Sequence, residues 1–334
     1  MVPRVHTPAE AVARLQSAFA SEEFSVVSGE PLFVVDLRGS AAASAGDDAD
    51  LARLRELACP SVGLVGDDVD SPLAKALDVR VSSDAQLAEL AAAVRNSPLA
   101  SLALVQLLRQ GESLGIVGGL VAESLVYSVL QSGPDFRAWL DGRKAKPARR
   151  QNPAPAVLSE RSGGRLEITL NRPDKHNAFS AEMRDGLVEA LHVAASDASL
   201  TEIVLRGAGP SFCSGGDLDE FGTLPDPATA HGIRSTRSPA RLMAECGERV
   251  TVELHGACVG AGIELPAFAG RVIAKPDTFV QLPELAFGLV PGAGGTVSVP
   301  RRVGRQRAAW LALTSARLPA EEALAWGLVD EIAP

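Results

Sequence analysis

The chain has 334 residues, which is long enough for about two domains with sizeable buried cores. Hydrophobic residues make up 46% of the chain and charged residues 22%, and this near-average composition excludes wholesale disorder. The formal net charge of −9 disfavours nucleic acid and anionic membrane surfaces as partners.

The first 146 residues begin with a mixed pattern and then become helical. Apolar runs predict buried strands at residues 32–37 and 61–65, and small acidic residues predict a solvated loop over 39–50. Apolar residues at three- and four-residue spacing predict helices at residues 8–20, 51–58, 86–94, from 98 onward, 117–131 and 135–140.

Strands and helices alternate in the remainder of the chain. Proline and basic residues across 144–156 predict an exposed linker, whose main part we place at 147–156. The elements that follow are strands at 165–170, 202–206 and 250–254 and a helix at 181–195 capped by Ser180. This alternation indicates an α/β layer fold with parallel pairing over residues 157–334.

Several common classes of protein find no support in the sequence. No uncharged apolar run reaches the roughly 18 residues of a membrane span, and the N-terminus lacks the apolar core of a signal peptide. We therefore expect a cytoplasmic protein with no membrane partner. The four cysteines lack CxxC spacing, and there is no P-loop, dinucleotide fingerprint or zinc-type histidine pair, so we expect reduced thiols and no metal.

Three turns rich in small residues, 209–217, 255–264 and 282–295, follow or connect predicted strands. Glycine in such turns allows a ligand to approach backbone N–H groups, and a helix that begins there adds a partial positive charge. Taken singly, each turn is explained better by tight packing than by ligand binding.

Taken together, these turns resemble the crotonase superfamily, which contains the enoyl-CoA hydratases and isomerases. Residues 171–178 resemble the first signature of that family, and residues 327–332 resemble its last core strand. The resemblance runs in order over residues 165–334. It implies a crotonase-like ββα spiral core at 157–334, with an additional α-rich region before it.

The resemblance also implies a site for an acyl-CoA thioester. The backbone N–H groups of Gly216 and Ala261 match the oxyanion hole, where preorganised donors stabilise the oxygen of an enolate. Glu264 and Glu284 match the two acids that hold the attacking water. A lone glutamate is usually a surface charge, but both of these stand inside family motifs.

Further substrate and CoA contacts are implied by position in the same motifs. The expected residues are Lys175, Asn177, Ala178, Ser214, Asp217, Gly260, Gly292, Phe136 and Lys144. Gly292 is expected to open a helix near the water, and Phe136, Arg143 and Lys144 to approach the adenosine phosphates. Solvated linker charge is an equal alternative for these residues. Cys213 and Ser214 lack the partners of a nucleophile, so small-residue packing is the favoured interpretation.

Family members continue after the last core strand into a helical module that closes the CoA site, and residues 77–146 resemble that module. Our hypothesis is that residues 1–146 form a degenerate half-crotonase whose helices act as the lid. The alternative is an unrelated helical appendage. The stretch 221–238 is expected to be a loop that forms the wall of the acyl pocket, and its sequence does not identify a substrate.

Because both acids are present, the sequence favours an enoyl-CoA hydratase, a lyase of fatty acid metabolism. The alternatives are a double-bond isomerase that uses Glu264 or Glu284 as a single proton shuttle, and a non-catalytic acyl-CoA-binding subunit. No cofactor is expected beyond the coenzyme A of the substrate. The family commonly forms trimers or hexamers, so we expect a homo-oligomer.

Overall fold

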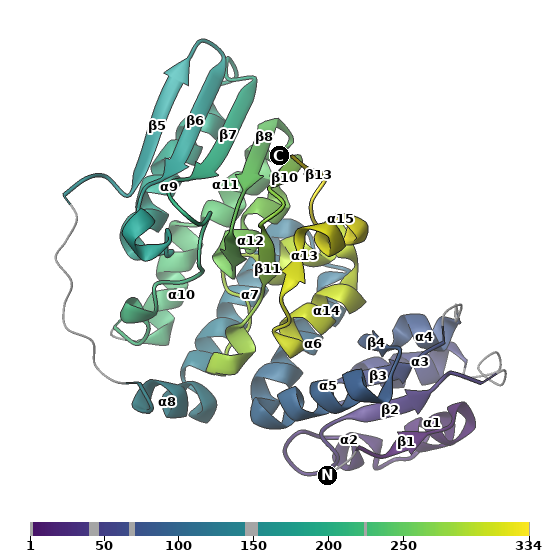
Figure 1. The fold of residues 1–334 in the computed structure, drawn as a ribbon. Coiled ribbons are helices and arrows are strands. Elements are labelled where there is room, and N and C mark those ends of the chain that lie inside the picture. The colour runs from purple at the N-terminus through teal and green to yellow at the C-terminus, as the bar shows by residue number, and fades with distance from the viewer. Residues whose placement is uncertain (1–2, 40–46, 67–70, 144–152, 224–225, 334) are drawn as a thin grey trace.

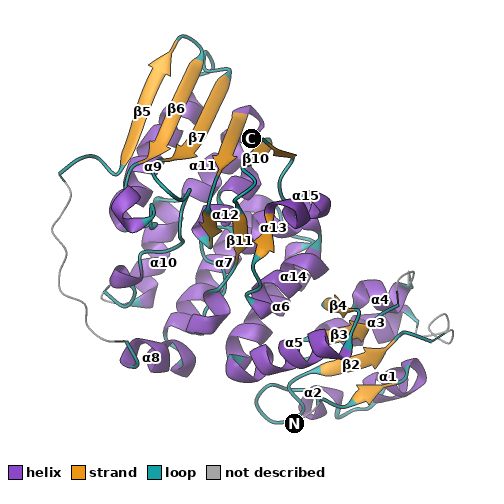
Figure 2. Cartoon of the chain, in the orientation of Figure 1, coloured by secondary structure: helices purple, strands orange, loops and turns teal. Residues whose placement is uncertain are grey.

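The computed structural model describes residues 3–39, 47–66, 71–143, 153–223 and 226–333. A small parallel sheet from the N-terminal half and a larger sheet from the C-terminal half lie far apart, with helices of both halves between them (Figures 1 and 2). The N-terminal helices α5 (Asp84–Asn96) and α6 (Pro98–Gly111) lie against α14 (Arg305–Thr314) of the C-terminal half.

The N-terminal half forms a sheet in the order β1-β2-β3-β4, with all neighbours parallel, followed by a run of helices. Its elements are β1 (Val5–His6), α1 (Pro8–Leu15), α2 (Ala20–Glu23), β2 (Phe33–Asp36), α3 (Asp48–Glu56), β3 (Ser61–Leu64), α4 (Pro72–Ala76), β4 (Val79–Val81), α5 (Asp84–Asn96), α6 (Pro98–Gly111), α7 (Ile116–Gln131) and α8 (Pro134–Asp141).

The C-terminal half forms a sheet in the order β13-β10-β8-β7-β6-β5, parallel except for the β5–β6 pair, and a smaller sheet β12-β11-β9. Its elements are β5 (Val157–Ser162), β6 (Arg165–Leu170), α9 (Ala181–Ser196), β7 (Glu202–Gly207), α10 (Pro227–Thr236), α11 (Pro239–Cys246), β8 (Val250–Leu254), β9 (Ala257–Val259), α12 (Ala261–Glu264), β10 (Arg271–Ala274), β11 (Phe279–Gln281), α13 (Gly295–Val303), α14 (Arg305–Thr314), β12 (Leu318–Pro319), α15 (Ala320–Trp326) and β13 (Glu331–Ile332).

The small sheet is apolar on both faces because it separates two cores. Val34 and Val62 face the main core, which also contains residues of α5, α6 and the whole C-terminal half. Phe33 and Val35, which alternate with them on β2, face a second core under α1, α3 and α4. The main core is therefore continuous through both halves of the chain.

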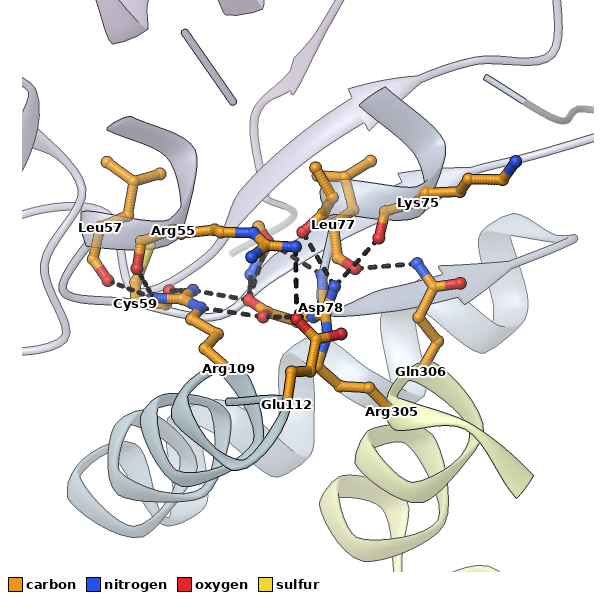
Figure 3. A network of polar contacts seen from close by, with 12 residues as sticks. Arg55, Leu57, Cys59, Lys75, Leu77, Asp78, Arg109, Glu112, Arg305 and Gln306 are labelled. Atoms are coloured by element: carbon orange, nitrogen blue, oxygen red, sulfur yellow. Dashed lines mark hydrogen bonds and ion pairs between the residues drawn. The ribbon is translucent and has the colours of Figure 1, made fainter. Parts of the chain in front are cut away.

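A buried ionic cluster also joins the halves (Figure 3). Asp78, just before β4, is 1% exposed and accepts hydrogen bonds from Arg109 of α6 at 2.6 Å and from Arg305 of α14 at 3.1 Å. The remaining donors of Arg109 reach carbonyl groups, among them that of Leu57 at 2.8 Å. The cluster satisfies its buried charges only when the small sheet, α6 and α14 are docked together.

The structure confirms most of the predicted elements, including the strands at β2, β3, β6, β7 and β8 and the helices α5, α6, α7 and α9. The helix predicted over residues 8–20 is interrupted between α1 and α2. The linker predicted at 147–156 falls largely outside the described residues, and Lys144 does so entirely.

Two predicted loops are wrong in part, and residues 40–46 of the first lie outside the described residues. The acidic end of the stretch 39–50 begins α3, where the Asp47 carboxylate accepts from the Asp50 N–H at 3.0 Å and Asp50 is 3% exposed. Carboxylates at a helix N-terminus satisfy its free N–H groups, so these acids start a helix and are not merely solvated. The stretch 221–238 contains α10, whose first turn is capped by Asp226.

No single helix in the described part of the chain has the length and hydropathy to cross a membrane, although the bent pairs α5–α6 and α7–α8 reach them when each pair is taken together.

Removal of the shared carboxylate should destabilise the whole chain. Asp78→Ala leaves the buried guanidinium group of Arg109 without a counter-ion and leaves Arg305 with only the half-exposed Glu112, and we expect a loss of about 3–5 kcal/mol in the free energy of unfolding by urea. The control is Glu112→Gln, because Glu112 meets Arg305 with a side chain that is 44% exposed and should cost less than about 1 kcal/mol. Equal losses in the two variants would contradict this account.

Candidate active site

A pocket of about 500 Å³ lies between the two halves of the chain. Helices α7 and α8 of the N-terminal half form part of its wall, and α10, α11, α12, the start of α9 and the turns after β7 and β11 contribute the other lining residues. The catalytic candidates of the C-terminal half therefore face a wall made by the N-terminal helices.

Two residues that line this pocket from adjacent turns have backbone N–H groups without a partner among the described residues. Gly216 lies in the turn after β7, and Ala261 is the first residue of α12. Neither N–H donates a hydrogen bond to any residue that the structure describes. The turns touch, because a Cβ placed on Gly260 would lie 3.6 Å from Gly215 Cα. This pair of donors is suited to a single oxygen atom on which negative charge develops.

The carboxyl groups of Glu264 and Glu284 converge beside these donors. Glu264 is 2% exposed at the end of α12, and Glu284 begins the short 3₁₀ helix after β11. A Cβ placed on Gly260, where φ is 50°, would lie 2.5 Å from Glu284 Oε1 and 3.7 Å from Glu264 Oε1. Only glycine fits at this position, and both acids reach the same point.

Glu264 is held by the N-terminus of α13. Its Oε2 accepts from the N–H of Ala293 at 2.7 Å and from that of Gly295 at 2.8 Å. The Ser298 hydroxyl donates to the Glu264 carbonyl at 2.7 Å. The direction of this carboxylate is therefore fixed by backbone groups, which cannot rotate away.

A third buried acid, Glu123 of α7, binds the alternate N–H groups of the same segment. Its Oε1 accepts from Gly294 N at 2.7 Å, and its Oε2 accepts from Thr296 N at 2.9 Å and from the Thr296 hydroxyl at 2.6 Å. A second N-terminal contact supports the other acid, since the Ser97 hydroxyl donates to the Leu285 carbonyl at 2.6 Å.

Burial raises the pKa of all three acids. It raises the pKa of Glu284 to about 8 and that of Glu123 to about 7. Burial, followed by the charge of Glu284, also raises the pKa of Glu264, against the lowering effect of its two N–H donors. Glu284 Oε2 is buried and has no partner among the described residues. Burial therefore favours a cluster that retains at least one proton at neutral pH, on Glu284.

Aromatic rings line part of the wall and pack behind it. Phe136 of α8 and Phe221 line the pocket, and Phe136 stacks at 5.8 Å on Trp139, which meets Phe287. The ring of Tyr127 on α7 packs against Gly292 so closely that a Cβ there would lie 2.4 Å from it.

The pocket brings together some of the residues predicted from the sequence and leaves others outside. Those that line it are Gly216, Asp217, Ala261, Glu264, Glu284, Gly292 and Phe136. Gly260 lies behind the acids, as described above. Ala178 is partly buried and outside the lining residues. Gly292 does not open a helix, because α13 begins at Gly295.

The first signature segment instead supports the turn that carries Gly216. Lys175 pairs with Asp217 at 2.6 Å, and the Ser214 hydroxyl donates to the Lys175 carbonyl at 3.4 Å. Asn177 is fully buried, and its amide donates to the carbonyls of Ala208 and Ser211 at 2.8 and 2.9 Å. These contacts fix the turn from behind.

The two cysteines nearest the site are buried thiols. Cys213 is 2% exposed and Cys258 is fully buried, and burial raises the pKa of both. Neither has the environment of an activated nucleophile, which agrees with the packing interpretation. No group of acidic, histidine or cysteine side chains suitable for a metal ion occurs among the described residues.

The sequence analysis missed Glu123, Tyr127 and Arg234, which all line the pocket. Glu123 did carry a signal, because it is the one acid in the otherwise apolar and small sequence of α7. A charged residue in the middle of such a helix is costly unless it has a buried partner. Arg234 was concealed by the loop assignment of 221–238.

Comparisons with known proteins agree with this geometry. The sequence profile described as enoyl-CoA hydratase/isomerase matches residues 160–334. The chain is 34% identical over 180 residues to the 1,2-epoxyphenylacetyl-CoA isomerase of Escherichia coli, covering 53% of this chain and 69% of that protein. It is 39% identical over 179 residues to a probable enoyl-CoA hydratase of Rhodobacter capsulatus, covering 53% and 68%.

The fold is similar to solved structures of the same kind. The crystal structure of an enoyl-CoA hydratase/isomerase from Mycobacterium paratuberculosis matches with a TM-score of 0.50 and 30% sequence identity, covering 54% of this chain and 73% of that one. The matched region is the C-terminal half, so the comparisons bear on the catalytic core and not on the N-terminal half.

Loss of one pocket N–H should be testable at Ala261. Ala261→Pro removes that N–H at the first position of α12, where proline is tolerated, and we expect a fall of about 10²–10³-fold in turnover of an acyl-CoA substrate. Ala261→Gly keeps the N–H and serves as the matched control. The assignment fails if both variants, folded as judged by circular dichroism, turn over equally.

Proposed function

The chain belongs to the enoyl-CoA hydratase/isomerase family, and we propose that it adds water across the double bond of a 2-enoyl-CoA thioester. The observation that carries the proposal is the convergence of Glu264 and Glu284 beside the two unpaired N–H groups of the pocket. Isomerisation requires a single acid that shuttles a proton, whereas hydration uses both acids, one to activate the water and one to protonate Cα.

In the proposed mechanism the thioester oxygen lies between Gly216 N–H and Ala261 N–H, and a water molecule lies between the acids. Glu264 takes a proton from this water while the water oxygen bonds to Cβ. The electrons of the double bond move toward the thioester oxygen, which gives an enolate. The two N–H groups stabilise that charge. Glu284 then donates its proton to Cα, and transfer of a proton from Glu264 to Glu284 restores the starting state.

The environments of the two acids support this division of roles. Burial raises the pKa of both acids, but the Glu264 carboxylate also has two backbone N–H donors from the start of α13, and these act against burial to favour the ionised form that the base requires. Glu284 has an oxygen without a partner and a pKa of about 8, which suits an acid that holds its proton at neutral pH. The net reaction adds water only, so the proposal includes no cofactor beyond the coenzyme A of the substrate.

We also propose that residues 77–146 act as the lid of this site. Helices α7 and α8 line the pocket, and Glu123 and Ser97 bind the segments next to Glu264 and Glu284. A homo-oligomer is part of the same proposal. Leu125 and Val129 of α7 are apolar, exposed and outside the lining of the pocket, and contacts between copies would cover them.

Substitution of either acid should remove turnover and preserve binding. We expect Glu264→Gln and Glu284→Gln each to lower kcat for crotonyl-CoA hydration by about 10²–10⁴-fold, while Glu245→Gln on the exposed face of α11 has no effect. A separate incubation with a 3-enoyl-CoA identifies an isomerase. Unchanged rates in both acid variants would remove the catalytic assignment, and binding without turnover of either ester would leave a CoA-ester-binding protein.

The pH dependence of kcat follows from the protonated form of Glu284. Because its pKa in the folded pocket is about 8, kcat should vary little just below that pH and fall as the pH rises through it, approaching about tenfold per pH unit. Steady-state rates with saturating crotonyl-CoA measure this. A kcat that rises across the same range would mean that Glu284 acts as the base.

A further inference from the structure

Arg234 of α10 is a half-buried cation in the pocket wall. Its Nε donates to the Ser124 hydroxyl at 3.0 Å, and its Nη2 donates to the Ser128 hydroxyl at 2.5 Å and to the Ser124 carbonyl at 3.2 Å. All of these acceptors are neutral groups of α7. Among the residues that the structure describes, no carboxylate lies within ion-pair distance of Arg234, and its Nη1 has no acceptor.

The other arginines of this wall differ from Arg234 in their surroundings. Each of the three near α10 and α11 meets a carboxylate: Arg184 and Arg237 meet Asp185 at 2.9 and 3.0 Å, and Arg241 meets Glu245 at 3.0 Å. Arg137 on α8 is solvent-exposed, so water can stabilise its charge. Arg234 combines partial burial with the absence of a counter-ion.

Glu123 acts on Arg234 only from a distance: its oxygens bind the start of α13, and no ion pair joins the two side chains. Burial accordingly lowers the pKa of Arg234. A cation removed from water without a partner is unfavourable, and an anion bound in the pocket would offset that cost.

Arg234 is connected to the acid pair through the ring of Tyr127. Its guanidinium carbon lies 4.8 Å from the centroid of the Tyr127 ring. The same ring packs against Gly292, and the next residue, Ala293, donates to Glu264. The Tyr127 ring and the segment 292–293 thus lie between Arg234 and Glu264, and Arg234 belongs to a different wall from α8, where the adenosine phosphates are expected.

We propose that Arg234 binds a carboxylate at the far end of the acyl group, so that the substrates are CoA thioesters of short dicarboxylic acids. This inference rests on the proposed function, because it places a CoA thioester in the pocket. A carboxylate can accept from the free Nη1 in a charge-assisted hydrogen bond, whereas the methyl end of a fatty acyl chain would leave the cation unpaired.

The test compares equilibrium binding of saturated esters in pairs of equal length. Succinyl-, glutaryl- and adipyl-CoA are each measured against butyryl-, pentanoyl- and hexanoyl-CoA on the full chain. For at least one length we expect the carboxylated ester to bind about tenfold more tightly. Arg234→Gln should bring that ratio to about one, Arg234→Lys should keep part of it, and the wall control Arg241→Gln should leave it unchanged.

The measured quantity is the ratio of the two dissociation constants. Loosening of α10 from α7 would weaken the binding of both esters and would therefore not reproduce the expected change in this ratio. A wild-type ratio near one at all three lengths overturns the proposal. So does a ratio that survives in Arg234→Gln, or an equal loss for both esters, which would indicate packing or contact with a CoA phosphate. Binding of saturated esters does not depend on turnover, so the two proposals can fail separately. Tighter binding of the carboxylated esters without hydration of crotonyl-CoA would refute the proposed function alone. Hydration of crotonyl-CoA without tighter binding of the carboxylated esters would refute this inference alone.

Discussion

Two buried carboxylates share the N-terminus of α13, and they come from opposite halves of the chain. The N–H groups of residues 293 and 295 bind Glu264, and those of residues 294 and 296 bind Glu123. A helix N-terminus offers unpaired N–H groups and a partial positive charge, so it can hold acids that burial would otherwise leave without partners. Glu264 acquires its fixed direction in this way, and α7 becomes attached to the site by the same helix.

This constraint explains why the segment before α13 is composed of small residues. A Cβ on Gly295 would lie 2.6 Å from Glu264 Cγ, and one on Gly292 would overlap the Tyr127 ring. Two carboxylates and a tyrosine therefore occupy the space that side chains would take. The buried cluster around Asp78 acts at the opposite end of the same interface, where it joins the small sheet to α14. The pocket between the halves depends on both attachments.

Local patterns were sufficient to predict much of this fold. Ser180 accepts from Met183 N as a helix cap should, and the apolar spacing of α5 and α7 located both helices. The motif resemblance placed Glu264, Glu284, Gly216 and Ala261, which the structure brings to one pocket. The contacts that complete the site were out of reach because their partners are distant in the chain. Glu123 binds a residue 171 positions away.

The central claim is that two main-chain amides bind the thioester oxygen while a pair of buried acids flanks the double bond. The most direct measurement is a crystal structure of the Glu284→Gln variant with crotonyl-CoA. The account predicts the thioester oxygen about 2.7–3.1 Å from both Gly216 N and Ala261 N, with Cβ facing Glu264. A thioester bound with its oxygen away from these two amides, or with its double bond outside the pocket, would contradict it.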